Sequence, residues 1–129
     1  MKLTRIDASH PLFEASFTLY ESSFPPNERR MREDHLRALQ DADFSPLGAV
    51  EDGMLLADVF LWETEDFCYL EHFAVQPSLR GHGTGSTILR QLLTQDKPLI
   101  LEIEPPEDEI TCRRKHFYER NGLCAQPYG

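Results

Sequence analysis

The chain has 129 residues, of which 40% are hydrophobic and 27% are charged, proportions typical of a single soluble globular domain. It carries 13 Lys and Arg residues against 22 Asp and Glu residues, and the net charge of −9 argues against nucleic acid as a partner, because nucleic acid usually binds a basic face. No apolar run approaches the ~20 residues of a membrane span, and the first ten residues lack the apolar core of a signal peptide. The three cysteines show no C-x-x-C spacing, which argues against a disulfide framework or a zinc site. We therefore expect a cytoplasmic protein with no bound metal and no membrane contact.

The first forty residues predict one short strand and two helices. The strand covers "LTRI" at residues 3–6. Aromatic residues at positions 13, 17, 20 and 24 then recur at helical spacing and form one apolar face, and Pro25-Pro26 ends that helix. A second, charged helix is expected from about Arg29 to Gln40.

Three strands are expected in the middle of the chain. "PLGAVED" (46–52) and "MLLADVFLWET" (54–64) flank Asp52-Gly53, a dipeptide typical of a hairpin turn. "FCYLEHFAV" (67–75) carries apolar residues on both faces, as expected of a buried central strand.

The remaining residues predict a glycine-rich loop, a helix, a strand, a second helix and the start of another strand. The first helix has Ile88, Leu89, Leu92 and Leu93 on one side. "LILEIE" (99–104) forms the next strand, residues 108–120 the second helix with Asn121-Gly122 as a left-handed C-cap, and "LCAQPYG" (123–129) begins the last strand. Strand, loop, helix and strand make a βαβ unit within a larger α/β sheet.

The glycine-rich loop "RGHGTG" (80–85) does not match the common nucleotide-binding motifs. No Lys-Ser/Thr pair follows the last glycine, as a Walker A loop requires, and the third glycine arrives one residue too early for G-x-G-x-x-G. Glycines at the start of a helix allow N–H groups of residues 81–86 to converge on an anion such as phosphate. The alternative is a flexible connection between strand and helix.

Two motifs resemble those of the GCN5-related N-acetyltransferases (GNAT). "HFAVQPSLRGHGTGSTIL" (72–89) is similar to motif A, in which the positions held here by Arg80, Gly83 and Gly85 bind the pyrophosphate of acetyl-coenzyme A. "RRKHFYERNG" (113–122) is similar to motif B, in which a tyrosine precedes the end of the last helix. The order of elements matches the family from the first residue. The resemblance implies one GNAT domain over residues 1–129, with a mixed, mostly antiparallel central sheet flanked by helices.

The family normally ends in a β-hairpin after the last helix, and this sequence has room for only one of its two strands. We expect either a longer native chain or a partner subunit, such as the second copy in a homodimer, to cover this sheet edge.

The resemblance also implies which residues bind the cosubstrate, acetyl-coenzyme A. The pantetheine arm enters a splay between two central strands and bonds to the backbone of the strand before the loop, which by position is Phe73, Ala74 and Val75. The residues expected around the pyrophosphate are Arg80, Gly81, His82, Gly83, Thr84, Gly85 and Ser86.

Two residues are candidates for the proton transfers. Tyr118 matches the family tyrosine that donates a proton to the coenzyme A sulfur; the alternative is that it only packs beside Phe117. Glu71 lies at the strand parity of Phe73 and Val75, which family glutamate bases use. An ion pair with Arg113 or Arg114 would explain Glu71 without catalysis.

The acceptor site is less clearly marked. Glu104 or Glu102 could also take a proton from the acceptor, and Glu28 could bind a cationic amine. His72 is expected to point to the opposite strand face and to be packed and hydrogen-bonded. Cys112 and Cys124 are interpreted as small apolar residues, because this family usually transfers the acetyl group directly.

The resemblance implies an N-acetyltransferase that moves an acetyl group from acetyl-coenzyme A to a primary amine, on a small molecule or a peptide. Two alternatives remain open. The chain could be a non-catalytic coenzyme A-binding or interaction module on the same fold, or an unrelated phosphate-binding βαβ protein.

Overall fold

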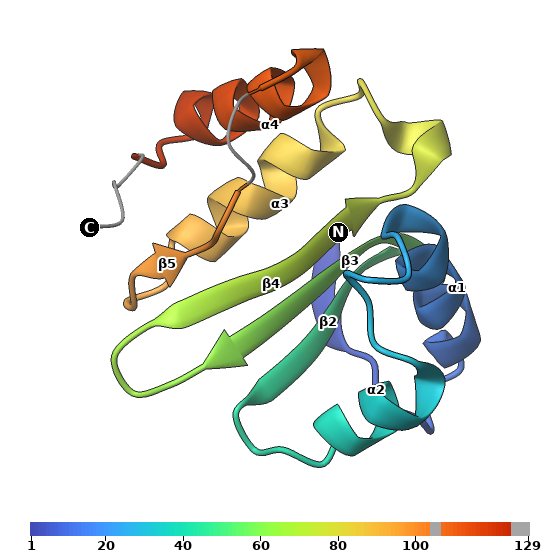
Figure 1. The fold of residues 1–129 in the computed structure, drawn as a ribbon. Coiled ribbons are helices and arrows are strands. Elements are labelled where there is room, and N and C mark those ends of the chain that lie inside the picture. Colours follow the sequence, from blue (N-terminus) through green and yellow to red (C-terminus); the bar gives the residue numbers. More distant parts are fainter. Residues whose placement is uncertain (104–106, 125–129) are drawn as a thin grey trace.

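The structure, a computed structural model, describes residues 1–103 and 107–124. Figure 1 shows a sheet with helices on both faces. In chain order the elements are β1 (Lys2–Arg5), α1 (Phe13–Ser23), α2 (Arg32–Ala38), β2 (Phe44–Glu51), β3 (Met54–Glu63), β4 (Cys68–Val75), the 3-10 turn η1 (Pro77–Leu79), α3 (Thr84–Leu93), β5 (Leu99–Ile100) and α4 (Glu109–Arg120).

The sheet has the strand order β1-β2-β3-β4-β5 and is antiparallel except for the parallel pair β4 and β5. Helices α1 and α2 cover one face, and α3 and α4 cover the other (Figure 1). The predicted mixed, mostly antiparallel sheet flanked by helices is therefore confirmed, as is the hairpin between β2 and β3, whose turn residues Asp52 and Gly53 have φ of 52° and 75°.

The face under α1 and α2 is filled by aromatic rings. Phe17 and Tyr20 of α1 pack with Phe44 and Phe60 of the sheet, as the helical spacing predicts. Each such side chain contributes about 1.5–3 kcal/mol when fully buried. His35 of α2 sits among these rings, and its burial lowers its pKa to about 4, so that it is neutral at pH 7.

Helix α2 is shorter than predicted, because the residues expected to begin it are used elsewhere. Arg29 Nη1 bonds to the carbonyl oxygens of Glu21 and Phe24, at 2.6 and 2.7 Å, at the end of α1. The Arg30 N–H donates to the Tyr20 hydroxyl. Both arginines thus belong to the loop that joins α1 to α2, hereafter the α1–α2 loop, residues 24–31.

Strand β4 contains a β-bulge that the alternating pattern did not predict. Leu70 pairs with Leu61 and His72 pairs with Phe60, so Glu71 is the extra residue. The bulge shifts the parity: Leu70, Phe73 and Val75 all pack against the cluster that includes α3.

The C-terminal elements match the prediction at α4 and differ at β5. The Asp108 side chain accepts a hydrogen bond from the Thr111 N–H in a capping box, and Gly122 has φ 96° as a left-handed C-cap requires. The strand expected over 99–104 is only two residues long; it turns away from β4 after Ile100, and residue 104 lies outside the described range. The strand predicted for 123–129 is not formed at Leu123 or Cys124, and the rest of it is not described. Within the described part of the chain, no helix has both the length and the apolar character needed to cross a membrane.

Candidate functional site

A cavity of about 1020 Å³ opens where β4 and β5 separate. The two strands pair only at Cys68–Leu99 and Tyr69–Ile100. Beyond these pairs, the edge of β4 from Leu70 to Val75 has no neighbouring strand in the described part of the chain, and both Phe73 and Leu101 line the cavity. Backbone polar groups of a central strand are thus available to a ligand.

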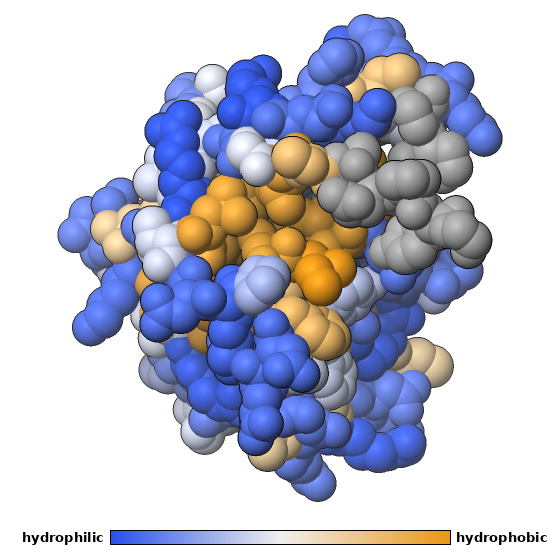
Figure 2. All heavy atoms as spheres, turned by 90° about the vertical axis from the view of Figure 1, so that its left-hand side faces the viewer, coloured by the Kyte–Doolittle hydropathy of each residue, from blue (hydrophilic) through white to orange (hydrophobic). Residues whose placement is uncertain are grey.

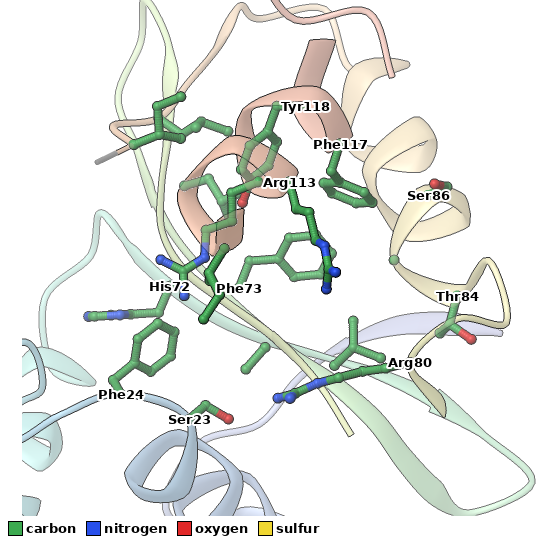
Figure 3. A pocket seen from close by; sticks show the side chains of 18 of the residues that line it. Ser23, Phe24, His72, Phe73, Arg80, Thr84, Ser86, Arg113, Phe117 and Tyr118 are labelled. Atoms are coloured by element: carbon green, nitrogen blue, oxygen red, sulfur yellow. The ribbon is translucent and has the colours of Figure 1, made fainter. Parts of the chain in front are cut away.

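Figure 3 shows how the helices close the cavity. Arg80 and Thr84 lie at one end, and Ser23 and Phe24 lie at the other. Tyr118 of α4 lies above the space between them. The cavity therefore connects the start of α3 with the α1–α2 loop.

The glycine-rich loop bends through two left-handed residues. Gly81 has φ 86°, and Gly83, the N-cap of α3, has φ 78°, a conformation that side chains with Cβ adopt at a cost of about 1–2 kcal/mol. The N–H groups of Thr84, Gly85 and Ser86 find no acceptor in the described residues. These donors, at the positive end of the helix dipole, make the site suited to an anion.

Gly85 serves a different purpose. A Cβ at this position would lie 3.3 Å from Phe117 Cζ and 3.6 Å from Val75 Cγ2. A glycine here thus lets α3 approach α4 and β4 closely, which narrows the cavity between them.

The cavity is rich in cations although the chain as a whole is acidic. Arg80 precedes the loop, and three arginines of α4 also line the cavity: Arg113, Arg114 and Arg120. Arg113 is in part engaged, since its Nη2 pairs with Glu109. A guanidinium group can bind phosphate oxygens in a bidentate manner, so these arginines suit a ligand with several phosphates.

His82 is the predicted loop residue that does not line the cavity. Its N–H bonds to the carbonyl oxygen of Leu79. The other predicted cosubstrate residues, Phe73, Ala74, Val75, Arg80, Gly81, Gly83, Thr84, Gly85 and Ser86, all line it.

Tyr118 lines the cavity and packs against Phe117, with ring centroids 5.2 Å apart. Burial raises the pKa of its phenol. The hydroxyl therefore keeps its proton at neutral pH. Tyr118 thus packs against Phe117 and also faces the cavity. Its packing is therefore compatible with a role as proton donor.

Glu71 lines the cavity, but the expectation that it shares the face of Phe73 and Val75 is wrong. The bulge turns its carboxylate toward the α1–α2 side. There Oε1 accepts hydrogen bonds from Arg30 Nη1 at 2.6 Å and from Trp62 Nε1 at 3.1 Å. Its ion-pair partner is thus Arg30 of the α1–α2 loop rather than Arg113 or Arg114.

His72 was correctly expected to be packed on the other face. It is buried against Tyr20 and Phe24, and burial lowers its pKa. The expected hydrogen bond is absent: Nδ1 has no partner among the described residues, and Nε2 lies 3.8 Å from Glu71 Oε1.

The end of the cavity beside the α1–α2 loop, expected to take the acceptor, is lined by Ser23, Phe24, Pro25 and Glu28. Glu102, from the segment after β5, also lines the cavity. The structure thus brings Glu28 to the cavity, as predicted. Glu104 lies outside the described residues. On the side of the molecule that carries β5, Figure 2 shows a hollowed face with apolar side chains at its centre and hydrophilic ones at its rim.

Sequence reasoning missed two residues that bond to Glu71 without themselves lining the cavity. Arg30 and Trp62, which hold Glu71, were assigned to a helix and to an ordinary strand position. Only contacts between distant segments identify them, since Arg30 and Glu71 are 41 positions apart. The sequence "FPP" (24–26) could have identified Phe24 as a residue that lines the cavity, because the two prolines end α1 and fix where the α1–α2 loop begins.

Comparisons with known proteins find the same family that the two sequence motifs resemble. The sequence profile of the acetyltransferase (GNAT) domain matches residues 45–122. A solved structure from Bacteroides thetaiotaomicron, assigned by its description to the GNAT family, is 30% identical, with a TM-score of 0.88 over 95% of this chain and 71% of that one.

Two further matches cover less of the chain or are less identical to it. YjbC of Bacillus subtilis, described as an acetyltransferase, is 33% identical over 60 residues, which are 45% of this chain and 31% of that protein, so the match spans about a third of the curated relative. A ribosomal-protein-alanine N-acetyltransferase from Brucella melitensis is 20% identical, with a TM-score of 0.69 over 100% of this chain and 96% of that one, and shares the fold.

Proposed function

The chain belongs to the acetyltransferase (GNAT) domain family, and from this premise we propose that it transfers an acetyl group from acetyl-coenzyme A directly to a primary amine. The observation that supports this most is the single cavity that joins the glycine-rich loop, the free edge of β4 and Tyr118. Acetyl-coenzyme A would supply the acetyl group as a thioester.

The residues present fit that cosubstrate. Gly81 and Gly83 leave the space beside the loop open, since a Cβ at either would meet nothing within 4 Å. The N–H groups of the first turn of α3, together with Arg80, would hold the pyrophosphate. The free edge of β4 at Phe73, Ala74 and Val75 would bond to the amides of the pantetheine arm.

Tyr118 is proposed as the proton donor to the departing thiolate. A phenol near pKa ~10 gives its proton to a thiolate whose acid has a pKa near ~8.5 slightly uphill. The raised pKa of Tyr118 makes this transfer somewhat harder. Close placement must therefore provide most of the effect.

Glu71 is proposed as the group that takes the proton of the acceptor amine, directly or through water. A primary amine with a pKa of ~10.4 is almost fully charged at pH 7 and cannot attack until it loses that proton. Glu71 has a side chain 26% exposed and lines the cavity, so its carboxylate is within reach of a bound acceptor.

The acceptor is proposed to be a cationic amine, small or at the end of a peptide. Glu28 and Glu102 line the cavity, and neither has an ion pair with a described residue. Carboxylates so placed would attract an ammonium group. A role for Glu104 remains a prediction from the sequence.

Free-thiol release from acetyl-coenzyme A, measured over a panel of aliphatic amines, diamines and peptides, tests the proposal. We expect release above the hydrolysis background with at least one amine. Coenzyme A binding without transfer to any amine would instead favour the non-catalytic module. Absence of coenzyme A binding would refute acetyl-coenzyme A as the cosubstrate.

A further inference from the structure

Arg30 and Glu71 form an ion pair at the acceptor end of the cavity that the proposed chemistry does not yet explain. Both donors to the Glu71 carboxylate, Arg30 Nη1 and Trp62 Nε1, bind the same oxygen, Oε1. Oε2 accepts no hydrogen bond from the described residues. The carboxylate is therefore held by one oxygen and left with the other available.

The guanidinium of Arg30 is itself held firmly. It lies 5.0 Å from the centre of the Phe44 ring and 5.8 Å from that of Tyr20, and the Arg30 side chain is 20% exposed. The backbone N–H of the same residue donates to the Tyr20 hydroxyl. The position of Arg30 is thus fixed by aromatic side chains of the α1 face, independently of Glu71.

The ion pair between Arg30 and Glu71 is not well explained by a contribution to folding stability alone. Nε and Nη2 of Arg30 are buried and have no hydrogen-bond partner among the described residues. Buried donors without partners are costly, and a half-buried ion pair is weak support for stability. A role at the cavity, through Glu71, accounts for this placement of Arg30 better than folding stability does.

Arg29 provides a direct contrast. Its guanidinium binds only backbone carbonyl oxygens, those of Glu21 and Phe24, and anchors the α1–α2 loop to the end of α1. Arg30, the next residue, reaches across to β4 and binds the carboxylate that lines the cavity. Two neighbouring arginines thus hold one loop, and only one of them contacts Glu71.

We propose that Arg30 is a positioning residue: with Trp62, it fixes the Glu71 carboxylate at the β4 bulge so that Oε2 faces the acceptor amine. The inference rests on the proposed function, because it assigns the group that orients the proposed base. It also links that base to the α1–α2 loop, whose Phe24 and Glu28 line the acceptor end. An acceptor that contacts this loop would therefore contact the segment that positions its base.

The test compares single and double variants. Arg30→Met keeps an aliphatic stem against Phe44 and removes the guanidinium; we expect kcat to fall about tenfold or more, with the KM for acetyl-coenzyme A within twofold. Arg30→Lys retains the charge and should recover part of the loss. Arg29→Met is the matched control, since it weakens the same loop without touching Glu71, and its kcat should stay within about twofold of the wild type.

The decisive comparison is with Glu71→Gln. If Arg30 acts through Glu71, the double variant Arg30→Met/Glu71→Gln should be no slower than Glu71→Gln alone, within about twofold. A double variant slower by the product of the two single losses would overturn the inference, as would equal losses for Arg29→Met and Arg30→Met. If Arg30→Met does not fold, Trp62→Phe, which removes the other donor, takes its place in the same comparison.

The outcomes separate this inference from the proposed function. A wild-type protein that acetylates no amine refutes the function, and the role of Arg30 with it. An active wild type whose Arg30→Met variant is equally active refutes the role of Arg30 alone. The emission of Trp62, the single tryptophan of the chain, should change in Arg30→Met and Glu71→Gln but not in Arg29→Met, because the indole N–H shares the Glu71 oxygen with Arg30.

Discussion

Asp58 should make the stability of the fold decrease with pH just above neutrality. Its carboxyl group is fully buried in β3, where Oδ1 accepts a hydrogen bond from Ser16 at 2.7 Å and Oδ2 has no partner among the described residues. Burial raises its pKa from 3.8 to about 8. The folded protein therefore binds one more proton than the unfolded chain between these values, and the free energy of unfolding falls as pH rises through this range.

The histidines restrict the window in which this decrease is visible. The pKa of His35 falls from 6.5 to about 4, and that of His72 is also lowered, so both contribute stability that increases with pH up to about 6.5. Below 6.5 their effect opposes that of Asp58. Above pH 6.5 the opposing histidine effect fades as the unfolded-state imidazoles lose their protons. The Asp58 effect, with a slope of about 1.36 kcal/mol per pH unit that falls to half at its pKa of about 8, amounts to about 1.6 kcal/mol between pH 6.5 and 8.

Urea unfolding at a series of pH values between 5 and 8.5 measures this effect, with Asp58→Asn as the comparison. Between pH 6.5 and 8 the wild type should lose about 1.6 kcal/mol of unfolding free energy relative to Asp58→Asn, which cannot ionise. The carboxyl groups with lowered pKa, such as those of Asp7 and Glu14, titrate below this window. An equal loss in both proteins would show that Asp58 is not the group responsible.

Two further predictions concern the loop and the sheet edge. Gly83→Asp should abolish most coenzyme A binding in calorimetry, because it places a carboxylate beside the free N–H groups; Gly53→Asp, whose backbone has nearly the same φ (75° against 78°) in a distant turn, is the control for strain and should bind normally. Equal binding by both would refute the phosphate loop. If a second copy of the chain covers the sheet edge at β5, light scattering should give the mass of a dimer. Ile100 is an apolar residue of β5 that is 41% exposed, so Ile100→Glu should shift the protein toward monomer. A wild-type monomer with full activity would contradict that expectation.

Local sequence signals predicted those parts of the fold that depend on near neighbours. Asp52-Gly53 marked the β2–β3 turn, Asn121-Gly122 marked the end of α4, and the glycines before α3 marked the left-handed residues that lead into this helix, because each of these conformations requires particular residues at particular positions. These signals, together with the family resemblance, identified residues that line one cavity in the structure, His82 excepted; their binding of the cosubstrate stays a prediction.

The acceptor end could not be predicted in this way, because it depends on contacts between distant segments. A single extra residue in β4 reversed the expected orientation of Glu71. Arg30 appeared to belong to a charged helix, yet its side chain binds β4 instead. The early divergence of β5 from β4 leaves no trace in the pattern of "LILEIE", although it opens the cavity.

The kcat of Tyr118→Phe for acetyl transfer tests the central claim most directly. The substitution keeps the ring packed on Phe117 and removes only the hydroxyl. Loss of a general acid typically costs 10²–10⁴-fold, so kcat should fall by about that factor while coenzyme A binding is kept, and the fall should shrink for acyl donors with a more acidic leaving thiol. Tyr69→Phe, on β4 but outside the lining of the cavity, should keep the wild-type kcat. A Tyr118→Phe protein with wild-type kcat and a poor leaving group would contradict the assignment of Tyr118 as the proton donor.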